Sequence, residues 1–183
     1  MKLYCEKCGR VEEYQVKAIN QTFDVRGIQV DASINVSVCN VCGSEVFNRE
    51  LEIQNDILVF DGYKEKKGLL TSKQIKYLRE MYGLSQSAFA RLLGFGEKTI
   101  TRYENGSIQD DAHDNILRLM FSEENFFLLW RRIRKDMSDS DNKRVEAKIS
   151  KEEQTTFEYN PKITTSLLFE MDSKGGLAVN GCN

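Results

Sequence analysis

The chain has 183 residues, of which 40% are hydrophobic and 30% are charged, with 12 glycines and one proline. This composition is typical of a globular protein with one large or two small domains, and it excludes collagen-like and low-complexity chains. The formal net charge of −2 excludes a polycation, so any binding of nucleic acid would depend on how charge is distributed along the chain.

Strand patterns fill the segment between two cysteine pairs, Cys5-x-x-Cys8 and Cys39-x-x-Cys42. Apolar and polar residues alternate there over residues 14–18 and again over 28–38, which is the period of half-buried strands. Arg26-Gly27 has the composition of a turn between two strands. A sheet this small cannot supply an adequate core alone, so we expect a bound metal to stabilise it.

The spacing of the two pairs suits one tetrahedral zinc site formed by Cys5, Cys8, Cys39 and Cys42. A glycine follows each pair, where the turn can require a positive φ. Because all four ligands are cysteine, no coordination position stays open, and we expect one structural zinc ion per chain. The alternatives are two disulfides, unbound thiols or an iron–sulfur cluster. The polar start of the chain is unlike a secretory signal, which favours metal ligands over disulfides.

A connector is expected after the second cysteine pair. The apolar residues between 46 and 60 fit no single period well, but they are compatible with a helix over about residues 48–60. Gly62 and the charged run Lys64–Gly68 then predict a hinge or a domain boundary.

Five helices are predicted beyond the connector, because capping residues recur before apolar stretches. Thr71 and Gln74 have the spacing of a capping box, and Ser85, Asp110 and Ser122 suit later N-caps. A further helix is expected to start near residue 96. Apolar residues expected on the inner faces of the first four helices are Ile75, Leu78, Tyr82, Ala88, Leu92, Ile100, Tyr103, Ile116, Leu117 and Met120. The fifth helix is strongly apolar, with Phe126, Phe127, Leu129, Trp130 and Ile133. The Ser- and Asp-rich residues 138–142 predict a linker.

The segment from residue 84 to 106 has the layout of a helix-turn-helix, in which one helix lies against phosphate and the next enters the major groove. Gln86 can donate to a phosphate at a helix N-terminus. Lys98 and Arg102 are four residues apart and share a helix face, from which an arginine can bond guanine bidentately. Thr99 and Thr101 are short donors suited to backbone or thymine contacts. A solvated charged face is the alternative interpretation.

Local charge agrees with this assignment, since residues 71–106 carry six Lys or Arg against three Asp or Glu. Phosphate contacts require such a local positive charge.

The two cysteine pairs followed by this helix-turn-helix resemble the MqsA (YgiT-type zinc finger) antitoxin family over roughly residues 1–135. The resemblance implies that the four cysteines hold a structural zinc in an N-terminal domain that contacts a toxin. It also implies a C-terminal domain that dimerises, binds operator palindromes and represses its own operon.

The resemblance further implies that Arg102 contacts bases, because it precedes Tyr103-Glu104 as the base-contacting arginine of the family does. The other base-contacting residue of the family is usually an asparagine, and Lys98 stands at that position here. A lysine cannot bond adenine bidentately, so the operator sequence does not carry over.

The sequence therefore predicts an α+β protein with four parts. These are a zinc-binding β domain over residues 1–50, a connector over 51–70, an all-α Cro/repressor-type helix-turn-helix domain over 71–136, and a C-terminal extension over 137–183 that we expect to be partly disordered.

The first functional hypothesis is a cytoplasmic antitoxin of a type II toxin–antitoxin system, which binds palindromic double-stranded operator DNA as a homodimer and neutralises a toxin. The alternatives are a stand-alone helix-turn-helix transcriptional regulator without a toxin partner, and a pure protein-interaction module. We expect neither an enzyme nor catalytic residues, because the single histidine, His113, suits a polar first helical turn and no nucleophile elbow, Walker loop or dinucleotide fingerprint occurs. We expect no membrane contact, since no apolar run approaches the ~20 residues of a membrane span.

Overall fold

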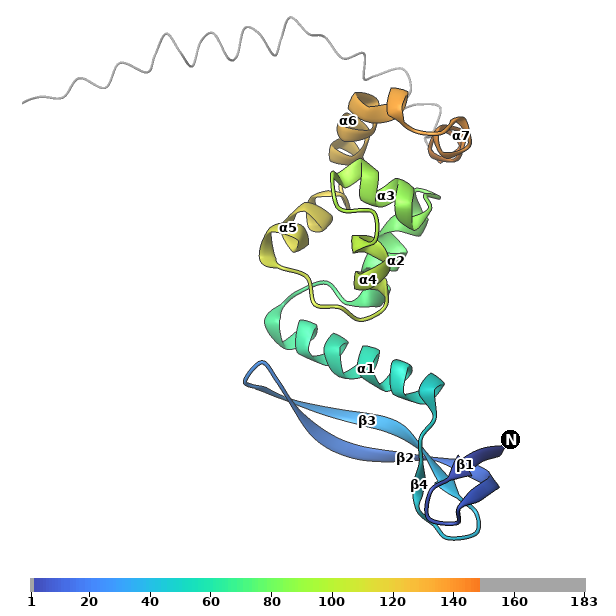
Figure 1. Ribbon diagram of the computed structural model, residues 1–183. Helices are drawn as coiled ribbons and strands as arrows, with labels where there is room; N and C mark the ends of the chain where they lie inside the picture. Colours follow the sequence, from blue (N-terminus) through green and yellow to red (C-terminus); the bar gives the residue numbers. More distant parts are fainter. Residues whose placement is uncertain (1, 149–183) are drawn as a thin grey trace, which may run out of the picture. The chain divides into compact units, whose positions relative to one another are not determined.

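The computed structural model describes residues 2–148, in which an antiparallel sheet precedes seven α-helices (Figure 1). The fold class predicted from the sequence is confirmed: a β-sheet that carries the four-cysteine cluster, then an all-α region. The disorder expected in the C-terminal extension concerns mainly residues 149–183, which lie outside the described residues. The division into domains at residues 50, 70 and 136 stays a prediction.

Four strands form the sheet in sequence order, each antiparallel to its neighbour: β1 (Lys2–Cys5), β2 (Arg10–Val25), β3 (Ile28–Cys39) and β4 (Glu45–Val46). Strands β2 and β3 form a long hairpin, and the short β1 and β4 pair only with its cysteine-bearing end. The turn predicted at Arg26-Gly27 is confirmed, with φ values of 52° and 80°. Two positive values in succession are typical of the type I′ turn that matches hairpin twist.

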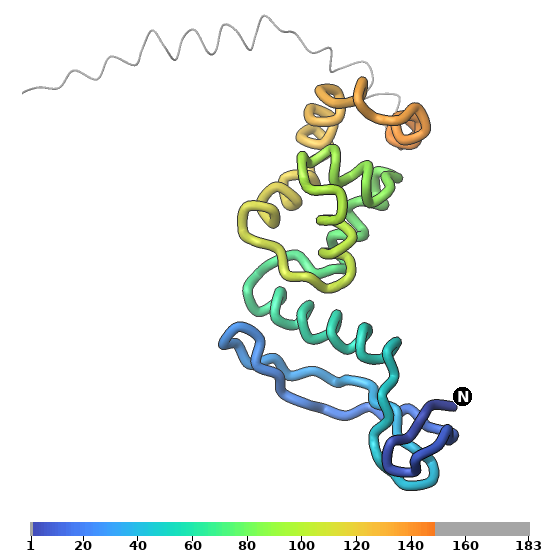
Figure 2. Tube along the Cα trace, viewed as in Figure 1, coloured from blue at the N-terminus to red at the C-terminus, as the bar shows by residue number. Residues whose placement is uncertain are grey.

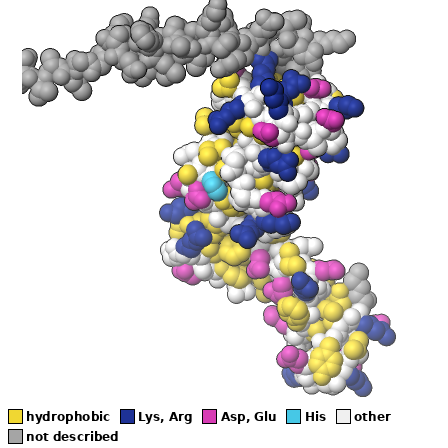
Figure 3. All heavy atoms as spheres, turned by 45° about the horizontal axis from the view of Figure 1, so that its top comes forward, with side chains coloured by type: hydrophobic (Ala, Val, Ile, Leu, Met, Phe, Trp, Pro, Cys, Tyr) yellow, Lys and Arg dark blue, Asp and Glu magenta, His cyan; other side chains and the backbone are white. Residues whose placement is uncertain are grey.

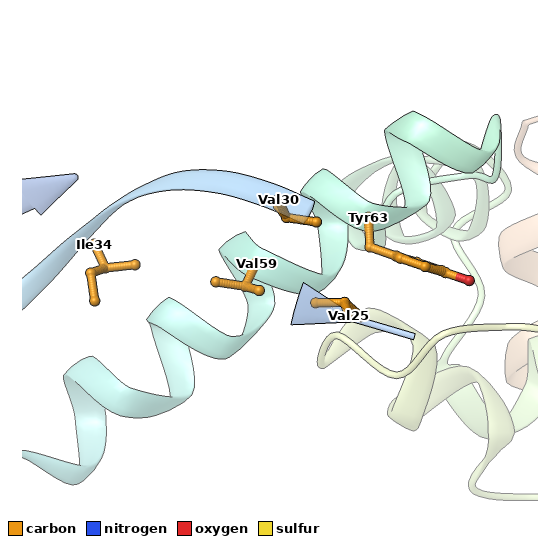
Figure 4. Close-up of a cluster of buried hydrophobic side chains, with 5 residues drawn as sticks. All are labelled: Val25, Val30, Ile34, Val59 and Tyr63. Atoms are coloured by element: carbon orange, nitrogen blue, oxygen red, sulfur yellow. The ribbon is translucent and has the colours of Figure 1, made fainter. Parts of the chain in front are cut away.

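The register of the hairpin gathers its apolar residues on one face. Ile19 lies opposite Ile34 and Phe23 opposite Val30 on this face, whereas Thr22 and Asp31 are hydrogen-bonded to each other on the other face. Helix α1 (Arg49–Lys67) lies along the apolar face (Figure 1, Figure 2). Figure 4 shows the side chains that meet between hairpin and helix, namely Val25, Val30, Ile34, Val59 and Tyr63.

Helix α1 begins where the sequence predicts but continues to Lys67, and the hinge predicted at residues 62–68 is therefore wrong. Gly62 lies inside the helix, where a Cβ atom would stand 2.8 Å from Val30 Cγ1, so the missing side chain permits close packing on the sheet. Lys64 is fully buried rather than solvated. Its ammonium donates to Asp61 Oδ1 at 3.0 Å and to Ser72 Oγ at 2.8 Å, while burial lowers its pKa.

The five helices predicted beyond the connector are present as α2 (Ser72–Met81), α3 (Gln86–Leu93), α4 (Thr99–Glu104), α5 (Asp111–Leu119) and α6 (Glu123–Ile133). Each predicted N-cap accepts a hydrogen bond from a backbone N–H of the first turn, and Thr71 and Gln74 form the complete capping box. Helix α4 starts at Thr99, three residues later than expected, because residues 95–98 are irregular or turn.

The linker predicted at residues 138–142 is wrong, because Ser138 is the N-cap of helix α7 (Asp139–Glu146). A short 3-10 helix, η1 (Arg134–Asp136), joins it to α6. Trp130 Nε1 donates to Asn142 Oδ1 at 3.0 Å, and Val145 is fully buried. The Ser and Asp residues that resemble a linker in composition are a cap and an acidic first turn, which stabilise a helix start.

The close approach at Gly62 generates a test. We expect Gly62→Ala to destabilise the protein by ~1–3 kcal/mol, because Val30 is β-branched and buried and cannot turn away from an added methyl group. Chemical denaturation measures the change. The same exchange in a Val30→Ala background is the control and should cost clearly less. An equal cost in both backgrounds would contradict a clash between the two side chains.

Candidate metal centre and nucleic-acid interface

Each cysteine pair lies in the same kind of tight turn. Gly9 N donates to Cys5 O at 2.9 Å, and Gly43 N donates to Cys39 O at 3.0 Å. The two glycines have φ values of 65° and 72°, in the left-handed region that a side chain disfavours. The turns therefore point the two sulfurs of each pair in one direction, as the spacing predicts.

The sheet brings the two turns together. The four Sγ atoms lie within 4.8 Å of one another, with Cys5 and Cys42 at 3.4 Å and Cys8 and Cys39 at 3.9 Å. Sulfurs at the corners of a tetrahedron around zinc, at ~2.3 Å from the ion, would be roughly 3.8 Å apart. The donor set thus fits a four-coordinate metal. A disulfide needs ~2 Å between two sulfurs, and these cysteines are unpaired thiols.

The thiols influence one another's protonation. Hydrogen bonds from Ser44 lower the pKa of Cys42 to about 6, whereas the adjacent Cys42 sulfur raises the pKa of Cys8 to about 12. The desolvation that comes with burial also raises the pKa of Cys8. Four sulfurs this close cannot all carry negative charge without a cation, and a divalent ion would supply the charge that holds them as thiolates.

The predicted DNA-contacting residues cluster around α3 and α4, the third and fourth helices of the all-α region. Lys98 and Arg102 are exposed, while Gln86, Thr99 and Thr101 are partly buried. Lys98 is the N-cap residue of α4 rather than part of its first turn, yet Arg102 N donates to Lys98 O at 3.0 Å, so the two stay one turn apart. Buried Ile100 and Tyr103 hold the opposite side of α4 in the core.

A polar network that sequence reasoning missed fixes α3 and α4 to α2. Glu104, whose side chain is 4% exposed, accepts from Arg79 Nε at 2.5 Å and from Nη2 at 2.9 Å. It also accepts from Gln86 Nε2 at 2.7 Å, and Gln86 Oε1 accepts from Thr101 Oγ1 at 2.8 Å. Gln86 and Thr101 therefore orient the two helices relative to each other. An amide nitrogen has two hydrogens, so Gln86 retains one for a ligand.

One signal in the sequence could have revealed this network. Arg79 occupies the apolar stripe of α2, one residue after Leu78 and four after Ile75, both of which are fully buried. A cation in such a stripe needs a buried anion, and Glu104 supplies it.

His113 has a structural environment. Its Nδ1 lies 2.7 Å from Tyr103 Oη, and its ring stacks on Phe95 with centroids 3.9 Å apart. Over residues 2–148, the four cysteines are the one group of three or more Cys, His, Asp or Glu residues arranged to hold a metal ion. In the same range, no helix is both long enough and apolar enough to cross a membrane.

Comparison with known families agrees with this geometry. The model of the family described as the antitoxin component of a bacterial toxin–antitoxin system, MqsA, matches residues 1–124. The match includes all four cysteines and α2 to α5, and it ends near the start of α6. No individual protein of curated function matches the chain.

The sulfur cluster generates a second test. We expect Cys39→Ser to reduce bound metal from about one ion per chain to near zero and to unfold residues 1–45 locally, because this end of the sheet has little other core. Metal analysis and hydrogen exchange measure both effects, and the helical region should keep its protection.

The matched control is Cys182→Ser, the same exchange at the fifth cysteine, which lies outside the described residues. Equal metal content and equal exchange in the two variants would show that the cluster does not hold the sheet together.

Proposed function

The chain belongs to the MqsA antitoxin family, and on this premise we propose that it is a zinc-stabilised repressor that binds operator DNA and neutralises a partner toxin. The observation that carries the proposal is a four-sulfur cluster on the sheet combined with a helix-turn-helix whose Arg102 is exposed. The family is not an enzyme family.

The proposed metal is zinc, one ion per chain, with a structural role. Four cysteine ligands leave no position for water or substrate, which is typical of closed zinc sites. The cluster also supplies most of the buried core at this end of the sheet, where Val46 is the one other buried side chain of the group. Metal binding and folding are therefore proposed to be coupled.

The proposed DNA-contacting residues are Gln86, Lys98, Thr99, Thr101 and Arg102. Exposed Arg102 projects from α4, which the network around Glu104 orients, and its guanidinium can bond guanine O6 and N7. The N-terminus of α3, with Gln86, favours a phosphate. Lys98 can bond guanine or phosphate but not adenine bidentately, so the preferred operator is expected to differ from one that an asparagine would select.

A homodimer and a palindromic operator complete the proposal. One recognition helix of six residues contacts too few base pairs for useful specificity, and two-fold symmetry would double the contacts. Family membership implies a toxin partner, and we propose that the zinc-bearing sheet contacts it in the cytoplasm.

Replacement of the base-contacting arginine tests the DNA-binding part. We expect Arg102→Ala to weaken binding to the DNA upstream of the protein's own coding sequence by ~1–3 kcal/mol and to leave the melting temperature unchanged. Fluorescence anisotropy measures the affinity for the upstream DNA and, for comparison, the affinity for a scrambled duplex. Arg49→Ala, at an exposed arginine on α1, is the control. Unchanged preference for the upstream DNA in Arg102→Ala would remove Arg102 from this role.

Co-expression tests the toxin part. A gene adjacent to that of this protein is expected to encode a small protein that arrests growth, and co-expression of this chain should restore growth and yield a co-purifying complex. If no neighbouring product arrests growth, or if rescue occurs without a complex, this chain does not neutralise a toxin by binding it. DNA binding without a partner would then indicate a stand-alone regulator.

A further inference from the structure

The last described helices lie beyond the family match and carry an excess of positive charge. Residues 131–148 contain seven Lys or Arg and four Asp or Glu. Figure 3 shows Lys and Arg side chains gathered over α6 and α7. The family model ends at residue 124, so family resemblance assigns this charge no role.

Helix α7 has a fixed place beside α3. The backbone carbonyl of Asp136, just before α7, accepts from Arg91 Nη1 near the C-terminal end of α3 at 3.4 Å. The other end of α7 meets the turn before α3, where a Cβ atom on Gly83 would lie 3.6 Å from Arg144 Cβ and 3.9 Å from Lys148 Cε. Helix α7 therefore runs antiparallel to α3, and Arg144 and Lys148 lie beside the N-terminus of α3.

The anchoring is a packed core rather than a surface contact. Val145 and Met137 are buried, and Asn142 accepts from Trp130 and donates to the carbonyl of Arg134 at 2.9 Å. The cations themselves stay accessible, since Lys148 is exposed and the Arg144 side chain is 57% exposed. Asp141, whose side chain is 16% exposed, lies 3.6 Å from the Arg144 guanidinium, so the pair is long and the exposed cation can also contact a phosphate.

We propose that Arg144 and Lys148 bind DNA phosphates adjacent to the phosphate at the N-terminus of α3, so that α7 lengthens the contact with the DNA backbone. This inference rests on the proposed function, because it requires α3 and α4 to lie on a duplex. Gly83 stands three residues before Gln86, so the two cations and the expected phosphate-binding N-terminus share one end of the helix pair. Such contacts add affinity without base preference.

A charge-neutral double variant tests the inference. The probes are the DNA upstream of the protein's own coding sequence and a random-sequence duplex of about 30 base pairs, three helical turns. For Arg144→Gln/Lys148→Gln we expect about tenfold or greater loss of affinity for both probes at low salt. The plot of log K against log salt has a negative slope, and its magnitude should decrease by about 0.9 for each lost phosphate contact.

The matched control is Arg132→Gln/Lys135→Gln, which removes the same charge from exposed positions at the junction of α6 and α7, near the start of α7 and away from Arg144 and Lys148. Equal salt slopes in the two double variants, or a loss confined to the upstream DNA, would overturn the inference. Arg102→Ala separates it from the proposed function. If Arg102→Ala loses its preference for the upstream DNA while Arg144→Gln/Lys148→Gln binds like the control double variant, the inference alone fails. If the wild-type protein binds neither probe, the DNA-binding part of the proposed function fails as well.

Discussion

The close approach of four sulfur atoms is the constraint on which the N-terminal sheet of this protein depends. The sheet has two separate cores: the hairpin end packs against α1, whereas the other end buries Cys5, Cys39 and Val46 and little else. Burial of so few side chains cannot offset the conformational entropy of ordering β1, β4 and two tight turns. We propose that a metal bound by the four cysteines supplies the missing stabilisation and fixes where the polypeptide reverses direction.

The helical half depends on a different interaction, the buried pair of Arg79 and Glu104. This pair joins α2 to α4, and Glu104 also accepts from Gln86 at the start of α3. Three helices are thereby positioned by one carboxylate, and Arg102, two residues before Glu104, is presented to solvent. A network with all its members hydrogen-bonded favours one arrangement over near alternatives, which a base-contacting helix requires.

Much of the fold was predictable because local chemistry determines it. Cysteine spacing, period-2 alternation in β3 and the capping residues Thr71, Ser85, Asp110 and Ser122 each act within a few residues of their own position. The errors arose where a distant partner decides the outcome. Lys64 can be buried because the Asp61 carboxylate balances its charge, and because Asp61 and Ser72 accept hydrogen bonds from its ammonium. Gly62 lies inside a helix because Val30 packs closely against it. Helix α7 is held by the burial of Val145 and by the hydrogen bond from Trp130 Nε1 to Asn142.

The candidate site divides in the same way. The four metal ligands follow from spacing alone, whereas the internal partners of Gln86 and Thr101 follow only from the packing of α3 on α4. The exposure of Lys98 and Arg102 agrees with their predicted role without testing it.

The most direct test of the metal-dependent account is X-ray absorption at the zinc edge, combined with metal quantification, on the purified full-length protein. The account predicts about one zinc per chain with four sulfur neighbours at ~2.3 Å and no lighter ligand in the first shell. A folded, metal-free protein, or zinc bound by fewer than four sulfurs, would contradict it.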